Sequence, residues 1–303
     1  MSTRWRQDGA KFDHGAQFFR VSTAEFAAEL ERWESMERAA KWAPKHPPGA
    51  VVPGVGDGCF VGTPTMNAPV AGLIEDAVAA GADLRRSTQV QQITASEGGG
   101  WTITVGARAD ALGTELRADH VVVTAPAPQV VALLAGVAPR IVKAASTAVF
   151  APCWALMVEF THALTLGHAV DFTAARVPDS PIAWIARESS KPGRARSERW
   201  VLHASQRWSA ENLEWTREQV TPVLLEAFAT FLGHPLPVVT YSSAHRWRYS
   251  LVTTPVGTPV LSSECGTLFA AGDWCLGGRV EAAWQSGAAA ADAVLASLGS
   301  AER

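Results

Sequence analysis

Several signals that would place a protein in a specialised class are missing from this sequence. Charged residues make up only 18% of the 303 residues and the formal net charge is −3, so no basic surface of the kind that binds nucleic acid is indicated. The four cysteines lack C-x-x-C spacing, which argues against a disulfide framework and a zinc site. The longest apolar run, within Ser286–Leu298, is too short to span a membrane and contains Asp292. Because Met1–Gly9 also lacks the apolar centre of a signal peptide, these absences predict a cytoplasmic globular protein that binds neither nucleic acid nor membranes.

Motifs of common hydrolases and phosphate-binding proteins are absent as well. The sequence contains no G-x-S-x-G, no H-E-x-x-H and no G-x-x-x-x-G-K. A glycine-rich stretch, Gly54-Val-Gly-Asp-Gly58, follows prolines and precedes Cys59-Phe-Val61. A dinucleotide-binding turn must instead follow a buried strand and open a helix. We therefore interpret residues 54–58 as a loop, and we predict no metal site.

The two ends of the chain have the pattern of an α/β domain. Hydrophobic residues make up 48% of the chain, enough for a sizeable core, and 303 residues favour about two domains. Residues 22–25 fit a helix-capping box, which predicts a helix from Ser22 to about Ala40. The other predicted helices cover Val70–Ala80, Ala127–Leu134 and Val280–Leu298. The strands predicted between them cover Leu84–Ile93, Trp101–Val105, His120–Thr124 (buried on both faces) and Thr267–Ala271 (buried).

Residues 144–263 have a different hydrophobic pattern, typical of an antiparallel sheet. A long helix interrupts them, with a capping box at Thr216-Arg-Glu-Gln219 and a stop at Leu232-Gly233. This arrangement predicts an α/β core interrupted by a strand-rich second domain. The strands predicted there cover Ala155–Phe160, Ile182–Arg187, Trp200–Ser205 and Val238–Trp247.

Two segments have residue types suited to holding a flat, hydroxyl-bearing ligand. In the first, a buried strand leads through Gly272 to Asp273, and a helix rich in small residues begins at Val280. A carboxylate there can accept hydrogen bonds from sugar-like hydroxyls, and the helix start offers unpaired N–H groups. In the second, Gly15 and Ala16 allow the backbone to approach a planar ligand. For both segments the alternative, an ordinary turn beside a strand, stays open.

The same segments resemble one known family. Phe12-Asp-His-Gly-Ala-Gln-Phe-Phe, Ala244-His-Arg-Trp-Arg-Tyr, Ala270-Ala-Gly-Asp-Trp and Val280-Glu-Ala-Ala-Trp-Gln-Ser-Gly are similar to motifs of the renalase-like FAD-dependent oxidoreductases, in the bacterial branch of the amine oxidase superfamily. Further blocks are Pro152-Cys-Trp-Ala-Leu-Met, Ile182-Ala-Trp-Ile-Ala-Arg and Ser189-Ser-Lys-Pro-Gly-Arg. The resemblance covers essentially the whole chain, in order.

The resemblance implies a two-domain flavoprotein. A discontinuous, Rossmann-type FAD-binding domain would comprise residues 1–21, 63–145 and 265–303, and an inserted α+β substrate domain with an antiparallel sheet would comprise residues 22–62 and 146–264. Family members open with a strand, G-x-G-x-x-G and a helix, whereas Met1-Ser-Thr-Arg4 matches residues that come after this βαβ unit. We therefore expect the Rossmann-type domain to be truncated at its N-terminus, either through a start codon assigned at an internal methionine or because the chain is a fragment.

The resemblance also implies which residues hold the cofactor. His14, Gly15, Ala16 and Gln17 would lie beside the flavin and its ribityl chain, and Asp273, after Gly272, would bind the ribityl or pyrophosphate region. The N–H groups around Glu281 and Ala282 would face the flavin N1–O2 edge. The further candidates are Val90 (adenine end), Pro126 (pyrophosphate loop) and Arg4 (phosphates, or simply a surface arginine). FAD is expected to be non-covalent, because Cys275 is not where covalent members carry their cysteine.

The function that follows is a flavin-dependent oxidation of a small molecule. Hydride would pass from a dihydronicotinamide-type compound or an amine to FAD, with O₂ as acceptor, and no catalytic acid or base is evident. His245, Arg246, Trp247 and Tyr249 are candidates for the pocket wall, or alternatively for a core strand of the substrate domain. Two other functions stay open: a binding protein or remnant that no longer holds FAD, and an NAD(P)-dependent dehydrogenase without flavin. The oligomeric state is not predicted.

Overall fold

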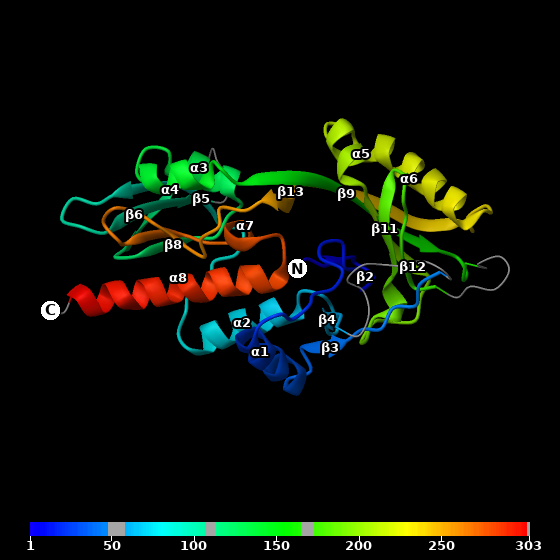
Figure 1. Cartoon of the computed structure of the whole chain (residues 1–303), viewed down its shortest axis with the longest axis horizontal. Helices are drawn as coiled ribbons and strands as arrows, with labels where there is room; N and C mark the ends of the chain where they lie inside the picture. The colour runs from blue at the N-terminus through cyan, green and yellow to red at the C-terminus, as the bar shows by residue number, and fades with distance from the viewer. Residues whose placement is uncertain (48–57, 107–112, 165–171, 302–303) are drawn as a thin grey trace. The chain divides into compact units, whose positions relative to one another are not determined.

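The computed structural model describes residues 1–47, 58–106, 113–164 and 172–301 (Figure 1). The chain forms two compact units: Met1–Ala77 with Ala151–Leu251, and Val78–Phe150 with Val252–Arg303. We call them unit 1 and unit 2. The two units group residues that contact one another, which does not test where a cofactor or substrate binds. The predicted FAD-binding domain (residues 1–21, 63–145 and 265–303) and substrate domain (residues 22–62 and 146–264) therefore stay a prediction. Residues 54–57 of the predicted glycine-rich loop lie outside the described residues.

Unit 1 is built on a five-stranded sheet with the strand order β10-β11-β12-β9-β13. The pairs β10–β11, β11–β12 and β12–β9 are antiparallel, which confirms the antiparallel sheet predicted for this part of the chain. β11 has the predicted bounds, whereas β9 begins earlier than predicted, at Val149, and β13 ends later, at Thr254. The strands are β9 (Val149–Phe160), β10 (Ala174–Arg176), β11 (Ile182–Arg187), β12 (Arg199–Ala204) and β13 (Val239–Thr254).

Helix α6 (Arg217–Leu232) packs against this sheet, as Figure 1 shows. The predicted capping box is present: Thr216 accepts a hydrogen bond from the backbone N–H of Gln219, whose side chain accepts one from Thr216 N–H. Gly233 ends the helix, also as predicted, and adopts the left-handed conformation. The buried face of α6 includes Phe228, whose ring lies 5.5 Å from that of Trp200 on β12. A short helix, α5 (Gln206–Glu211), precedes it.

The first helix of unit 1 is shorter than predicted. α1 (Ala24–Ser35) is capped by Thr23, which accepts from Phe26 N–H, and not by Ser22. It ends well before Ala40, because Glu37 adopts a left-handed backbone (φ 56°) and the chain then turns into a strand. The remaining elements of this part are β1 (Arg4–Trp5), β2 (Lys11–Phe12), β3 (Ala39–Lys41), β4 (Phe60–Gly62) and α2 (Ala68–Ala79), which reaches the start of unit 2.

Unit 2 contains two small sheets and four helices among its described residues. Strands β5 (Gln89–Ala95), β6 (Trp101–Gly106) and β7 (Thr114–Ala118) form an antiparallel meander. β8 (Val121–Val123) pairs in parallel with β15 (Leu268–Ala270), and β14 (Leu261–Ser262) lies on the other side of β15. The helices are α3 (Ala127–Leu134), α4 (Pro139–Ala145), α7 (Asp273–Leu276) and α8 (Val280–Ala301).

These elements confirm a mixed α/β fold and correct three details. β15 is buried as predicted, but Val122 of β8 is 39% exposed, because β8 is the last strand of its sheet as described. The predicted strand over Leu84–Ile93 begins only at Gln89. Helix α4 and strand β7 were not predicted from the sequence. No helix in the described ranges is long and apolar enough to cross a membrane.

The capping box of α6 gives a first prediction. Thr216→Ala removes the acceptor for Gln219 N–H and should lower the free energy of unfolding by about 1 kcal/mol, measured by urea denaturation. Thr230→Ala is the matched control: Thr230 is exposed within the same helix and its hydroxyl donates to Glu226 O at 2.9 Å. This control should be neutral or slightly stabilising, since alanine has the higher helix propensity. Equal effects of the two substitutions would contradict the capping role.

Candidate functional site

The segment from Phe12 to Phe19, predicted to lie beside a cofactor, is largely buried in unit 1. Phe12, Asp13, His14 and Gln17 are each no more than 6% exposed. The segment leaves β2 and has little regular structure until Phe19, which pairs with Phe60 in a β-bridge. A side chain at Gly15 would come within 3.2 Å of the backbone of Ser2, so glycine suits this close approach.

A buried network of charges holds this segment in place. Asp13 accepts hydrogen bonds from Arg194, from Met66 N–H at 2.9 Å and from the Thr3 hydroxyl at 2.7 Å. Lys191 donates to Glu188 at 2.7 Å, and its ammonium lies 3.7 Å from Asp13. Two carboxylates and two cations thus neutralise one another where water is excluded.

The pKa values of the two carboxyl groups move in opposite directions. Burial alone would raise the pKa of Asp13, but the charges of Lys191 and Arg194 and the hydrogen bond from Arg194 bring it below its ordinary value. Burial raises the pKa of Glu188, and the neighbouring Lys191 opposes this only in part. Asp13 is therefore the firmly ionised member of the pair.

Gln17 connects this network to the backbone of the same segment. Its side-chain oxygen accepts a hydrogen bond from Lys191 at 3.1 Å, and its amide donates to Gly15 O at 3.2 Å and to Asp13 O. Glu188 in turn accepts from Asp13 N–H at 3.2 Å. The conformation of residues 13–17 is thus fixed by side chains that come from residues 188–194.

Three aromatic rings gather on the other side of this segment, and all of them were predicted site residues. The ring of His14 lies 4.9 Å from that of His245 and 5.1 Å from that of Trp247, and the last two are 4.4 Å apart. Trp247 Nε1 donates to His14 O at 3.0 Å. Arg4 donates to His245 Nδ1 at 3.3 Å, so it contacts the cluster directly.

The remaining candidates for the pocket wall lie on β13, where successive side chains point to opposite faces of the sheet. His245, Trp247 and Tyr249 share one face of the strand. Arg246 belongs to the other face, where it donates to Leu213 O at 2.7 Å and forms an exposed ion pair with Glu214.

The histidines of this region are held neutral. Burial lowers the pKa of His14 to about 4, with His245 and Arg4 adding to the effect. His203, which donates to His14 O at 3.3 Å, also has its pKa lowered to about 4, mainly by burial. Burial and the charge of Arg4 lower the pKa of His245. His14 Nδ1 is buried and has no hydrogen-bond partner among the described residues.

In unit 2 the parallel pairing of β8 and β15 brings two predicted loops together. Trp274 Nε1 donates at 3.0 Å to Ala125 O, directly before Pro126. A side chain at Gly272 would come within 2.5 Å of that same nitrogen, so only glycine leaves room for the indole. Gly272 N–H donates to the Ser286 hydroxyl of α8 at 2.9 Å. Hydrogen bonds therefore connect the loops after both strands to each other and to the first turns of α8.

Asp273 and the start of α8 complete this arrangement. Asp273 opens α7 and is half-buried, and burial raises its pKa while the N–H of Trp274 partly opposes the shift. Glu281 and Ala282, in the first turn of α8, are 3% and 0% exposed. Val90 pairs with Val105 in the meander, and its side chain is 41% exposed.

Sequence reasoning missed the charged partners of the N-terminal segment. Lys191 and Arg194 belong to the block Ser189-Ser-Lys-Pro-Gly-Arg, which was noted only for its resemblance, and Glu188 and His203 were not singled out. The usable signal was three charged residues around a Pro-Gly turn between two apolar strands. Their partners in the N-terminal segment, Asp13 and Gln17, lie more than 170 positions away in sequence, so spacing could not identify these contacts.

Comparisons with known proteins agree with one another. Residues 11–295 match the family described as flavin containing amine oxidoreductase. Cyclohexylamine oxidase from Brevibacterium oxydans IH-35A superposes with a TM-score of 0.56 at 14% identity, over 82% of this chain and 56% of its own. An oxidoreductase from Methanosarcina mazei gives a TM-score of 0.56 at 15% identity, over 78% and 56%. A protoporphyrinogen oxidase candidate from Exiguobacterium sp. 255-15 gives 0.52 at 18% identity, over 66% and 42%. The chain spans about half the length of these structures, which resemble it in fold.

The charge network predicts a large cost for removing its lysine. Lys191→Met keeps the volume but leaves two buried carboxylates with one cation, and should lower the free energy of unfolding by about 3–5 kcal/mol. The double variant Lys191→Met/Glu188→Gln should recover part of this loss, since the unpaired charge is gone. Lys143→Met, on the exposed surface of α4, is the control and should stay within about 0.5 kcal/mol of wild type. A cost below about 1 kcal/mol for Lys191→Met would contradict the network's role.

The neutral histidines predict a loss of stability in mild acid. The unfolded chain takes up a proton at His203 below about 6.5, whereas the folded chain does so only near 4; protons therefore favour unfolding within this window. The contribution of His203 is roughly 1 kcal/mol per pH unit there. His203→Gln should flatten the dependence of unfolding free energy on pH by that amount, whereas His162→Gln, at an exposed site, should not. An unchanged slope in His203→Gln would show that this imidazole is protonated in the folded protein.

Proposed function

Because the chain belongs to the flavin-containing amine oxidoreductase family, we propose that it binds FAD non-covalently and oxidises a small reduced molecule. The substrate is a dihydronicotinamide-type compound or an amine, as in the renalase-like group that the sequence resembles. FAD would accept a hydride from this substrate, and O₂ would take up the two electrons. The similar solved proteins support this proposal only through their shared fold, because this chain spans about half of their length.

The observation that carries the proposal is the turn at the ends of β8 and β15. In α/β proteins, ligands bind beyond the carboxyl ends of parallel strands. Here that position holds Asp273, a half-buried carboxylate whose pKa is raised by burial. A carboxylate of this kind suits hydroxyl groups of a ribityl chain, which can donate hydrogen bonds to it without carrying charge.

The residues present fit a flavin in two further respects. The first turn of α8 carries the small residues Ala282 and Ala283, which let a flat ligand approach the start of this helix closely. In unit 1, the orphaned Nδ1 of His14 is a buried polar atom that a ligand can satisfy. Asp273, with Glu281 and Ala282 in the first turn of α8, would hold the cofactor in unit 2.

When bound, FAD supplies the hydride acceptor; the work of the chain is to bind, orient and exclude water. Residues 14–17 are fixed by Lys191 and Glu188, so a ligand meets a backbone that need not reorganise. His245 and Trp247 offer flat, uncharged walls to a planar substrate. Burial lowers the pKa of His14 and of His245, which favours the uncharged form of both rings.

The test is a titration of the full chain with FAD, compared with the same titration of Asp273→Asn. Loss of the charged acceptor should weaken FAD affinity by roughly 3- to 30-fold while the melting temperature of the cofactor-free protein changes little. Asp292→Asn, on the exposed side of α8, is the matched control and should bind FAD like wild type. Unchanged affinity together with a destabilised apoprotein would make Asp273 a structural turn residue.

The reaction itself is tested by anaerobic mixing of the FAD-loaded chain with a dihydronicotinamide or with an amine. The proposed activity bleaches the oxidised-flavin absorbance with one of the two, and admission of O₂ restores it with one H₂O₂ formed per turnover. An unbleached flavin with both substrate classes would leave a flavin-binding protein without the proposed activity. Failure to bind FAD at all would favour a remnant.

A further inference from the structure

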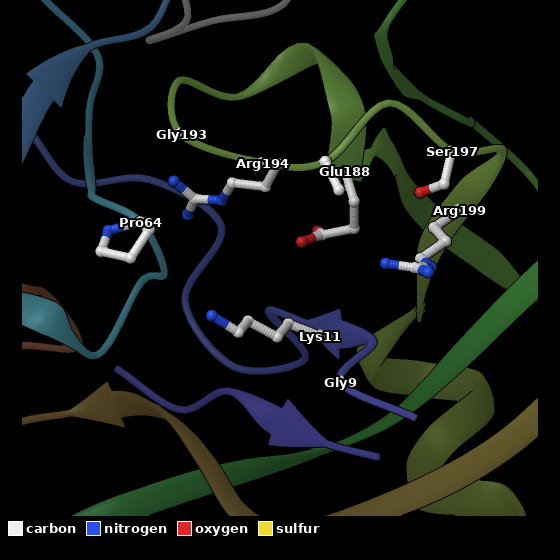
Figure 2. A pocket seen from close by; sticks show the side chains of 9 residues that line it. Gly9, Lys11, Pro64, Glu188, Gly193, Arg194, Ser197 and Arg199 are labelled. Atoms are coloured by element: carbon white, nitrogen blue, oxygen red, sulfur yellow. The ribbon is translucent and has the colours of Figure 1, made fainter. Parts of the chain in front are cut away.

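A pocket of about 190 Å³ opens in unit 1, and Glu188 and Arg194 of the charge network form part of its wall (Figure 2). Lys11 reaches it from β2, Arg199 from β12, and Glu188 from the short 3-10 helix η1 (Glu188–Ser190). Gly193, Arg194 and Ser197, in the loop between η1 and β12, complete its wall. None of the predicted cofactor or substrate residues lines it.

The pocket has more hydrogen-bond donors than the described protein can satisfy. The Lys11 ammonium lies over the Trp5 ring at 4.1 Å and has no carboxylate partner among the described residues. Arg199 uses its Nε for Glu159 at 2.7 Å, which leaves its two terminal amino groups without an acceptor in the same ranges. The Ser197 hydroxyl is buried and has no partner there either.

The acceptors around the pocket are already in use. Glu188 accepts from Lys191 and from Asp13 N–H. Arg194 is committed to Asp13 and to the carbonyl oxygens of Gly62 and Pro192. The wall therefore contributes a surplus of donors and one positive charge, that of Lys11, which no acidic side chain of the network balances.

We propose that this pocket binds a small oxyanion, a phosphate group in the first instance. An oxyanion offers several acceptor atoms at once, and its bonds to lysine and arginine are charge-assisted. The volume lies below the roughly 300 Å³ of pockets that hold drug-sized ligands, so it suits a phosphate and little more. The ligand is either free phosphate or the phosphate of a larger molecule whose remainder lies outside.

The experiment is isothermal titration calorimetry of the full chain with inorganic phosphate and, in parallel, with glycerol phosphate. Sodium chloride at equal ionic strength is the blank. Wild type should show saturable, one-to-one binding. Lys11→Gln should weaken it by about 10-fold or more, and Ser197→Ala, which removes only the orphaned hydroxyl, by about 3-fold. Lys143→Gln, on α4 of unit 2, is the control with unchanged affinity. Circular dichroism verifies that each variant is folded.

Repetition with excess FAD separates this pocket from any phosphate-binding part of a cofactor site. Phosphate binding that persists with FAD and is lost in Lys11→Gln supports the proposal. Binding that FAD abolishes, binding unchanged in both Lys11→Gln and Ser197→Ala, or no saturable heat with either probe would overturn it. None of these outcomes depends on the proposed oxidation, because flavin reduction is not measured.

Discussion

The buried attraction among Asp13, Glu188, Lys191 and Arg194 is the constraint on which the arrangement of unit 1 depends. Ion pairs out of contact with water gain little net stability, since desolvation offsets much of the attraction. They are nevertheless demanding in geometry, because a single misplaced partner leaves an uncompensated charge. In this protein the ion pairs constrain the backbone of residues 13–17, which has almost no regular secondary structure of its own. A segment without a helix or strand thereby acquires a single conformation.

The features that could be predicted from the sequence are those with a local cause. The capping box at Thr216, the glycine stop at Gly233 and the bounds of α3 depend on residues a few positions apart. The errors have nonlocal causes. Residues 39–41 would continue a helix by periodicity, but they pair with β4 instead. Val122 has the pattern of a fully buried strand residue, yet its exposure depends on which strands surround β8.

The candidate site divides in the same way. Gly272 and Asp273 could be found from a strand, a turn and a helix in succession. That Pro126 lies close to that turn follows only from the parallel pairing of β8 and β15. His14, His245 and Trp247 were singled out by motif, but their mutual contact links residues more than 230 positions apart. The role of Lys191 could not be predicted for a related reason. Its ammonium is buried beside two carboxylates and an amide, and these groups come together only in the fold.

The alternation along β13 has a consequence for how this protein can change over evolutionary time. One face of the strand carries His245 and Trp247, and the opposite face carries Arg246 and Arg248, both bound to Glu214. Side-chain direction in a strand has a period of two, so a one-residue shift exchanges the two faces. Deletion of any single residue between Val239 and Ala244, if absorbed as such a shift, would put two guanidinium groups where two neutral rings now lie. Substitutions can adjust this face gradually, whereas a change in strand length would make it positively charged in a single step.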